Sequence, residues 1–165
     1  MVSLLDIIGP VMVGPSSSHT AGACRLGLLG RGLVSGTPQT ALLELHGSFA
    51  RTGEGHGTDK ALAAGLLGFK PDDERIRTAL QIAEQEGLDY RFDKISLEDS
   101  AHPNTVRMTL ERGNIKATLT GCSLGAGRVL VTEIDGYPVE ISGNFHTIAL
   151  VAEDRKGSIA RITGL

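Results

Sequence analysis

The stretch TVRMTLERGNIKATLT, residues 105–120, decides the fold class that the sequence predicts. It contains two short strand-like segments, and the RGN between them is typical of a hairpin turn. Four further segments of this kind occur from Tyr90 onward: YRFDKI, RVLVTEI, PVEIS and TIALVAE. The second half of the chain is therefore predicted to form a mostly antiparallel sheet.

The first half of the chain is predicted to be mainly helical. Leucines recur at helical spacing in HTAGACRLGLLGRGLV (19–34), and Gly68 closes a second helical pattern in GTDKALAAGLLG (57–68). The most regular pattern is PDDERIRTALQIAEQEG (71–87), which has a proline and three acids at its start and a glycine after its end. The sequence predicts one continuous helix there.

Two shorter elements complete the prediction. ALLELHGSFA (41–50) alternates like a half-buried strand, and Ser3–Ile8 is predicted to be a short helix. Two or three helices packed on a mostly antiparallel sheet make an α+β fold.

The composition is that of a globular chain. The 165 residues are 41% hydrophobic, the net charge is -3 and aromatics make up only 4%, so nucleic acid is not an expected partner. No apolar run approaches the ~20 residues of a membrane span, and the apolar start lacks the basic region of a signal peptide. The two cysteines, Cys24 and Cys122, suggest a reducing cytoplasm.

Glycine is the residue in excess, with 22 copies among 165 residues against a usual ~7%. Such a glycine content suggests loops in which the backbone passes close to another group.

The stretch GPSSSHTAG, residues 14–22, places a row of polar side chains just before a predicted helix. Helix N-termini carry unpaired N–H groups and a partial positive charge, so they bind anions. A row of hydroxyls there suits a carboxylate or a phosphate. The alternative is an N-cap with spare serines in a solvated loop, although one serine suffices for a cap.

The stretch GSFARTGEGHGTDKA, residues 47–61, places Glu54 and His56 between alternating glycines. The spacing matches neither a Walker phosphate loop nor a dinucleotide fingerprint. What remains is a histidine on a flexible glycine-rich loop, and imidazole gains and loses a proton near neutral pH, which suits proton transfer. The alternative is an ordinary solvated histidine.

Two more polar stretches have weaker signals. HPNT (102–105) and the glycine-rich GCSLGAGRV (121–129) are explained about as well by turn chemistry as by a ligand site. The five histidines show no metal-binding spacing, and His46 alternates with leucines on its strand, which predicts a structural role.

Taken together and in order, these motifs resemble one family. The stretches are SLLDIIGPVMVGPSSSHTAG, GSFARTGEGHGTDKA, AHPNT, GCSLGAGRVLVTEIDG and ISGNFHTIALVAEDRKGSIARIT. From about Ser3 to Leu165 the chain resembles the beta chain of bacterial iron–sulfur-dependent L-serine dehydratase. The pair GPSSSHT and GxGHGTD is the most specific part of the resemblance.

The resemblance implies an enzyme that converts L-serine to pyruvate and ammonia with a 4Fe-4S cluster. It implies that a separate alpha chain carries the cluster and that this chain is not active alone. A cluster with one open iron still needs at least three cysteine thiolates, and this chain has two cysteines. The fold is expected to resemble the allosteric substrate-binding domain of some 3-phosphoglycerate dehydrogenases.

Carried over by motif, His56 is the expected catalytic acid or base. The expected supporting loop is Gly55, Gly57, Thr58, Asp59 and Lys60. The expected substrate-binding residues are Ser16, Ser17, Ser18, His19, Thr20 and Asn104. No metal ligand is assigned to this chain.

Two functional hypotheses follow. In the first, this chain lends catalytic residues to a site shared with the alpha chain; in the second, it binds serine as a regulatory module and acts at a distance. A glycine-flanked histidine favours the first, because a sensor needs only the carboxylate site. A purely structural subunit is a third, less informative reading.

The end of the chain resembles the start of an ACT domain. Residues 1–143 are expected to form the main domain, and residues 144–165 are expected to form an incomplete βα segment. Either the rest of the ACT-like unit belongs to a longer gene product, or the incomplete segment packs elsewhere. The segment 146–152 is expected to pair with the chain's own sheet or with a second copy, giving a homodimer. An effector site at 154–157 is expected to be incomplete.

Overall fold

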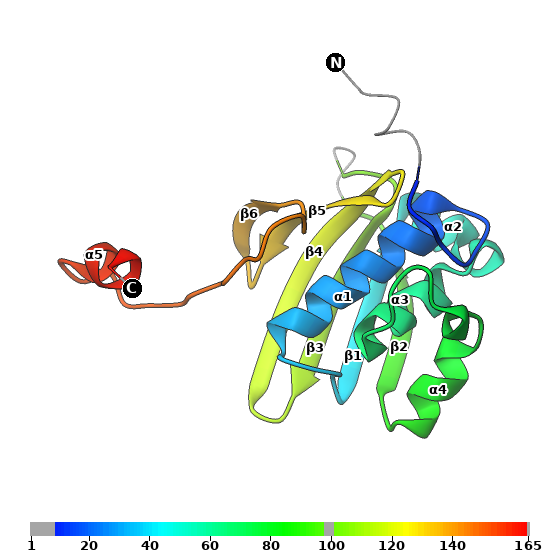
Figure 1. Cartoon of the computed structure of the whole chain (residues 1–165), viewed down its shortest axis with the longest axis horizontal. Coiled ribbons are helices and arrows are strands. Elements are labelled where there is room, and N and C mark those ends of the chain that lie inside the picture. The colour runs from blue at the N-terminus through cyan, green and yellow to red at the C-terminus, as the bar shows by residue number, and fades with distance from the viewer. Residues whose placement is uncertain (1–8, 98–100, 165) are drawn as a thin grey trace, which may run out of the picture.

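The computed structural model describes residues 9–97 and 101–164. Its centre is a six-stranded sheet in the order β2-β1-β3-β4-β5-β6, and helices pack on one face of it (Figure 1). The strands are β1 (Thr40–His46), β2 (Asp89–Ile95), β3 (Thr105–Arg112), β4 (Ile115–Gly125), β5 (Arg128–Ile134) and β6 (Tyr137–Ile141). The predicted α+β class is confirmed, whereas the expected helix at 3–8 lies outside the described residues.

All but one of the strand pairings are antiparallel. β3 and β4 form the predicted hairpin around Gly113, whose φ of 58° is the left-handed conformation that glycine adopts most readily. The exception is β2, which pairs parallel to β1. Parallel neighbours need a crossover connection, and the helices between residues 47 and 85 supply it.

The helices are η2 (Ser17–Gly22, a π-helical turn), α1 (Ala23–Leu33), α2 (Gly47–His56), α3 (Thr58–Leu67), η3 (Glu74–Thr78, 3₁₀) and α4 (Ala79–Gln85). They cover the sheet face that carries Leu43, Met108 and Leu119, all of which are fully or almost fully buried. On the opposite face, Arg107 forms two hydrogen bonds to the paired Glu44, of 2.6 and 2.8 Å, and this interaction lowers the pKa of Glu44.

Helices α1 and α3 pack backbone to backbone. A Cβ on Gly27 would collide with the carbonyl oxygen of Leu62, and a Cβ on Gly65 would collide with that of Cys24. Both positions therefore need glycine because of close approach. This contact brings α1, which follows the polar row at 14–22, next to α3, which begins within the glycine-rich stretch 47–61.

The expectation of one continuous helix over 71–87 is wrong. Asp73 accepts a hydrogen bond from the backbone N–H of Arg75 and so caps a 3₁₀ turn that begins at Glu74. Thr78, with φ −116° and ψ 17°, then separates this turn from α4. Side-chain capping overrides the helical periodicity here.

The segment after β6 differs from the prediction. Residues 145–155 form no strand and do not pair with the sheet. They pass β6 and lead out to the short helix α5 (Ser158–Thr163) (Figure 1). Arg25 on α1 fixes the start of this segment by donating to Gly127 O (2.8 Å), Asn144 Oδ1 (3.1 Å) and Gly143 O (3.4 Å).

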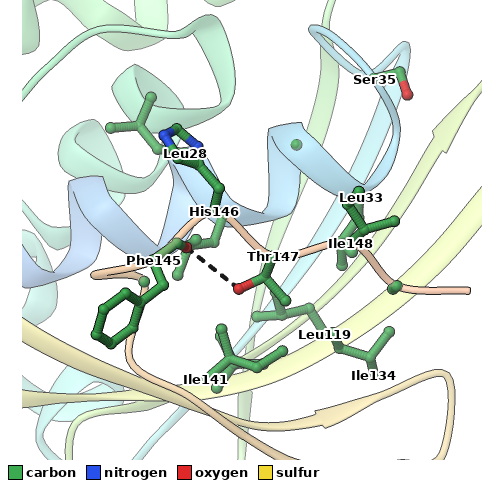
Figure 2. Close-up of a pocket in the computed structure, with 15 residues that line it drawn as sticks. Leu28, Leu33, Ser35, Leu119, Ile134, Ile141, Phe145, His146, Thr147 and Ile148 are labelled. Atoms are coloured by element: carbon green, nitrogen blue, oxygen red, sulfur yellow. Dashed lines mark hydrogen bonds between the residues drawn. The ribbon is translucent and has the colours of Figure 1, made fainter. Parts of the chain in front are cut away.

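An apolar pocket of about 580 Å³ lies between this segment, helix α1 and strands β4 to β6. Figure 2 shows Leu28 and Leu33 of α1 on one side and Leu119, Ile134 and Ile141 of the sheet on the other. Phe145, His146, Thr147 and Ile148 run across its opening. Within the described ranges, no helix has the length and apolar character needed to cross a bilayer.

Candidate functional site

The four polar motifs of the sequence meet at the N-terminal end of α1. Ser17 Oγ accepts a hydrogen bond from the backbone N–H of Ala126 in the β4–β5 turn (3.2 Å). Thr20 Oγ1 donates to the backbone carbonyl of His56 (3.3 Å). The backbone N–H of Ser48, at the start of α2, donates to the carbonyl of Pro103 (2.6 Å). Four stretches far apart in the sequence are thus tied into one cluster.

The expectation of a flexible loop around His56 is wrong. Residues 47–56 form helix α2, Gly57 turns the chain with φ 72°, and Thr58, Asp59 and Lys60 form the first turn of α3. The Pro103 carbonyl accepts from two N–H groups of the first α2 turn, and buried Phe49 anchors the helix to the core. These tertiary contacts overcome the low helix propensity of three glycines.

His19 is the centre of the cluster and is 9% exposed. Its backbone N–H donates to Ser16 Oγ (3.1 Å), which caps the η2 turn. Its Nε2 lies 3.2 Å from both Ser48 Oγ and Thr52 Oγ1 on α2. Burial lowers the pKa of His19, and the neighbouring His56 lowers it further, so this ring is neutral at neutral pH.

His56 lies beside His19, with ring centroids 5.0 Å apart and planes inclined by 38°. Its Nδ1 is 2.9 Å from the backbone carbonyl of Thr52, one helical turn earlier. Because a carbonyl only accepts, Nδ1 carries the proton in this contact. The other nitrogen, Nε2, is therefore left with its lone pair on an exposed side chain.

The hydroxyl row, Ser16–Thr20, is largely engaged within the protein. Ser16, Ser17, His19 and Thr20 each form the internal hydrogen bonds described above. Ser18 Oγ lies near Gly125 of the β4 end, at 3.7 Å from the position of a Cβ there. The row therefore fixes the shape of the cluster as well as offering polar atoms to a ligand.

Asn104 joins the cluster through the end of β4. Its backbone carbonyl accepts from Ser123 N (3.0 Å), and its own N–H donates to His102 Nδ1 (3.1 Å). In the part of the chain that the structure describes, Asn104 Oδ1 and Ser123 Oγ are buried without a hydrogen-bond partner. Buried polar atoms without partners are costly, so these two mark unsatisfied polarity at the end of β4.

A pocket of about 310 Å³ lies beside His56, on the side where the loop 13–15 passes η3. Its polar lining is Thr20, Glu54, His56, Lys60 and Arg77. Of the expected substrate-binding residues, the structure places only Thr20 on this pocket, whereas the catalytic candidate His56 and the expected supporting residues Gly55, Gly57 and Lys60 line it.

The family model named serine dehydratase beta chain matches residues 3–134. The chain belongs to this family. It is 46% identical over 165 residues to the probable L-serine dehydratase beta chain of Bacillus subtilis, and 42% identical over 164 residues to the L-serine dehydratase beta chain of Peptoniphilus asaccharolyticus. Each comparison covers 99% of this chain and 74% of the relative.

L-serine dehydratase 2 of Escherichia coli is similar over a smaller share of its own length. The identity is 29% over 173 residues, covering 86% of this beta-chain family member and 37% of the Escherichia coli protein. The family assignment confirms the resemblance that the motifs indicated.

The residues of this family member do not fit a 4Fe-4S cluster. Both cysteines are free and buried. Burial, helped by Asp73 and Asp72, raises the pKa of Cys24 to about 12, and its Sγ donates to the carbonyl of Phe69 (3.2 Å). Burial also raises the pKa of Cys122. Iron ligation needs thiolates, and two protonated thiols do not supply the three or four that a cluster requires.

Other ligand groups do not replace them. Within residues 9–97 and 101–164, no three His, Cys, Asp or Glu side chains lie close enough to hold a metal ion. His46 Nδ1 accepts from the backbone N–H of Leu97 (3.0 Å), which fits the structural role predicted for it.

Sequence reasoning missed three residues of the site. Ser48 and Thr52 bind His19, and their spacing of four residues on one helix face would have been a signal only if α2 had been recognised as a helix. Arg77 lies about twenty residues from His56 in sequence and reaches the pocket only through the fold.

Proposed function

We propose that this chain is the beta subunit of an L-serine dehydratase and that it lends residues to an active site shared with an alpha subunit. The names of the relatives from Bacillus subtilis and Peptoniphilus asaccharolyticus, each a beta chain of L-serine dehydratase, support the reaction and the partner. Conversion of L-serine to pyruvate and ammonia requires removal of the Cα proton and departure of the hydroxyl group. The 4Fe-4S cluster, whose ligands this chain does not supply, belongs to the alpha subunit in this proposal.

The proposal rests chiefly on the geometry of His56. Its Nδ1–H is held by the Thr52 carbonyl, so Nε2 is the nitrogen with the free lone pair, and the side chain is exposed. We assign to Nε2 the transfer of a proton at the reacting centre, either from Cα or to the leaving hydroxyl. His19, kept neutral by burial, holds helix α2 through Ser48 and Thr52 without adding a positive charge beside His56.

Substrate contacts are assigned to the hydroxyl row and Asn104. The row lies in the turn that presents His19 to α2, and Thr20 lies on the same pocket as His56. Asn104 Oδ1 is an acceptor that the described part of the protein leaves unsatisfied. Gly57, with its positive φ, lets α2 end at His56 and α3 begin at Thr58, and Asp59 and Lys60 lie in the first turn of α3.

The proposal is tested by mixing the purified chain with the alpha subunit under anaerobic conditions and measuring pyruvate from L-serine. The mixture should be active and this chain alone should not. His56→Ala should lower kcat by roughly 10²–10⁴-fold with little change in KM, which is the usual worth of a general acid or base. His146→Ala, at an exposed histidine outside the cluster, serves as the matched control.

An inactive mixture would refute the assignment to this reaction. If the mixture is active and His56→Ala leaves kcat unchanged, His56 is not the proton carrier. If the variant then raises KM while kcat holds, His56 only binds substrate.

A further inference from the structure

We propose that the pocket beside His56 recognises its ligand as a zwitterionic α-amino acid, with Arg77 and Lys60 binding the carboxylate and Glu54 binding the ammonium group. The inference rests on the proposed function, because it names the part of that same site that distinguishes an amino acid from other small hydroxy compounds. Arg77 and Glu54 have no role in the assignments made above.

The three charged residues come from three elements. Arg77 lies on η3, Lys60 in the first turn of α3 and Glu54 in the last turn of α2. All three line the 310 Å³ pocket together with His56 and Thr20. This volume is at the lower end of the range of about 300–1,000 Å³ typical of small-molecule sites, as a small metabolite requires.

The backbone holds these elements in place. Ile76, next to Arg77, is 3% exposed and anchors η3 in the core, so its neighbour is carried to the pocket rim. The N–H of Val13 donates to the carbonyl of Pro71 (2.8 Å), which closes the loop 13–15 against the chain that leads into η3. Thr20 Oγ1 bonds the His56 carbonyl on the opposite side. The pocket is therefore bounded by ordered contacts on each side.

The charges match an α-amino acid. Such a molecule carries one carboxylate and one ammonium on the same carbon, and the pocket offers a guanidinium, an ammonium and one carboxylate. A guanidinium binds a carboxylate through two parallel N–H donors, which fixes its orientation as well as its charge. With both ends of the molecule held, the Cα hydrogen and the side chain are the parts left near His56.

Arg77 is available for this contact. Its present partner is Glu74, at 3.3 Å on the same short helix, and both side chains are more than 70% exposed. Ion pairs this exposed contribute about 0–1 kcal/mol, so they are readily exchanged for a ligand carboxylate in a pocket.

The test is made on the two-chain enzyme with Arg77→Gln and Lys60→Gln. Arg77→Gln should raise KM for L-serine by roughly 10–100-fold and change kcat far less, since a hydrogen bond to a charged group is worth about 1.5–3 kcal/mol. Lys60→Gln should have an effect in the same direction. Arg77→Lys, which keeps the charge and loses the paired donors, should fall between wild type and Arg77→Gln. Arg91→Gln is the matched control, because Arg91 is also an exposed arginine paired with a nearby acid.

A second readout is inhibition by glycine, which keeps the carboxylate and the ammonium but cannot react. Its inhibition constant against L-serine should rise with Arg77→Gln and with Glu54→Gln, and should stay close to wild type in His56→Ala at residual activity. The subsite would be overturned if glycine failed to compete with L-serine in the wild type. It would also be overturned if Arg77→Gln had the same KM and the same inhibition constant for glycine as the control Arg91→Gln. A normal kcat in His56→Ala would instead overturn the proposed function, so the two failures are distinguishable.

Discussion

At the scale of single residues, the site depends on one buried histidine that supports an exposed one. His19 is enclosed by the edge of Phe49, at a centroid distance of 5.3 Å, and by the ring of His56. Its hydrogen bonds to Ser48 and Thr52 are made by a ring that burial keeps neutral. Protonation of His19 would place a positive charge in this enclosure, next to a second imidazole.

This arrangement predicts acid sensitivity of the fold. The pKa of His19 in the folded protein is lower than its ordinary value of 6.5, so below about pH 6.5 the unfolded chain binds more protons at this residue than the folded one. The free energy of unfolding should therefore fall as the pH decreases from 6.5 toward the lowered pKa. Urea unfolding between about pH 8 and pH 5 measures the effect.

His19→Asn should flatten this pH dependence, whereas His146→Asn at an exposed position should not. The carboxylates affect the stability at lower pH than His19 does. The pKa values of Glu44 and Asp73 are lowered from 4.5 and 3.8, so these two groups change the free energy of unfolding only below those values. An unchanged slope in His19→Asn would contradict the prediction.

The sequence indicated which polar stretches are unusual, but it did not indicate how they contact one another. The hydroxyl row and His56 stand out in the sequence because a protein core does not need polar side chains in such a pattern. Their interactions could not be predicted, because Ser17 bonds the β4–β5 turn and Thr20 bonds the His56 carbonyl across long stretches of sequence. Arg77 gave no local signal, since an arginine on an exposed helical turn is ordinary.

At the scale of elements, the site is built on the contact between α1 and α3. The absence of side chains at Gly27 and Gly65 lets the two backbones touch. Helix α1 continues the turn that holds His19, and α3 begins two residues after His56. The distance between the two helices therefore sets the distance between the two halves of the site.

Gly27→Ala and Gly65→Ala should destabilise the protein by about 1–3 kcal/mol, the cost of an added methyl group that has no space, because each new Cβ meets backbone atoms that cannot rotate away. Gly32→Ala on the same helix is the control. A Cβ there meets nothing within 4 Å, so this change should be neutral or stabilising by up to about 1 kcal/mol. Urea unfolding with circular dichroism separates the two outcomes, and equal effects at positions 27 and 32 would disprove the packing argument.

Elements with strong local signals were predicted well. α3 begins and ends where its threonine and Gly68 indicate, and the β3–β4 hairpin turns at the expected glycine. α2 was missed because three glycines hide a helix that is stabilised from outside by the Pro103 carbonyl. The parallel direction of β2 was also missed, since a strand pattern carries no information about the direction of its neighbour.

At the scale of the whole molecule, the segment from Phe145 to Thr163 differs from the rest. Phe145, Ile148 and Val151 are 83%, 81% and 91% exposed, although each is large and apolar. Phe145 and Ile148 line the apolar pocket of Figure 2, and Ile148 and Val151 line a second pocket with residues of β6. An apolar extended segment next to a sheet edge is a site for pairing with another chain.

We therefore expect the segment 146–152 to pair with the same segment or with β6 of a second copy, giving a homodimer. Light scattering should give the mass of a dimer, and amide exchange should be slower in 146–152 at high than at low protein concentration. Ile148→Lys together with Val151→Lys should produce a monomer without changing the stability of the main domain. A monomer in the unmodified chain at all concentrations would contradict this expectation.

The central position of β1 also has a kinetic consequence. β1 lies between β2 and β3, so it pairs with residues 89–95 on one side and 106–111 on the other, and both partners follow it at long range in the chain. The β3–β4 hairpin closes a two-residue turn, so we expect it to form early, whereas β1 can be inserted only after long loops have closed. Because α2 begins directly after β1, we expect the pair of His19 and His56 to be assembled late, so that the hairpin of a refolding chain forms before its candidate site.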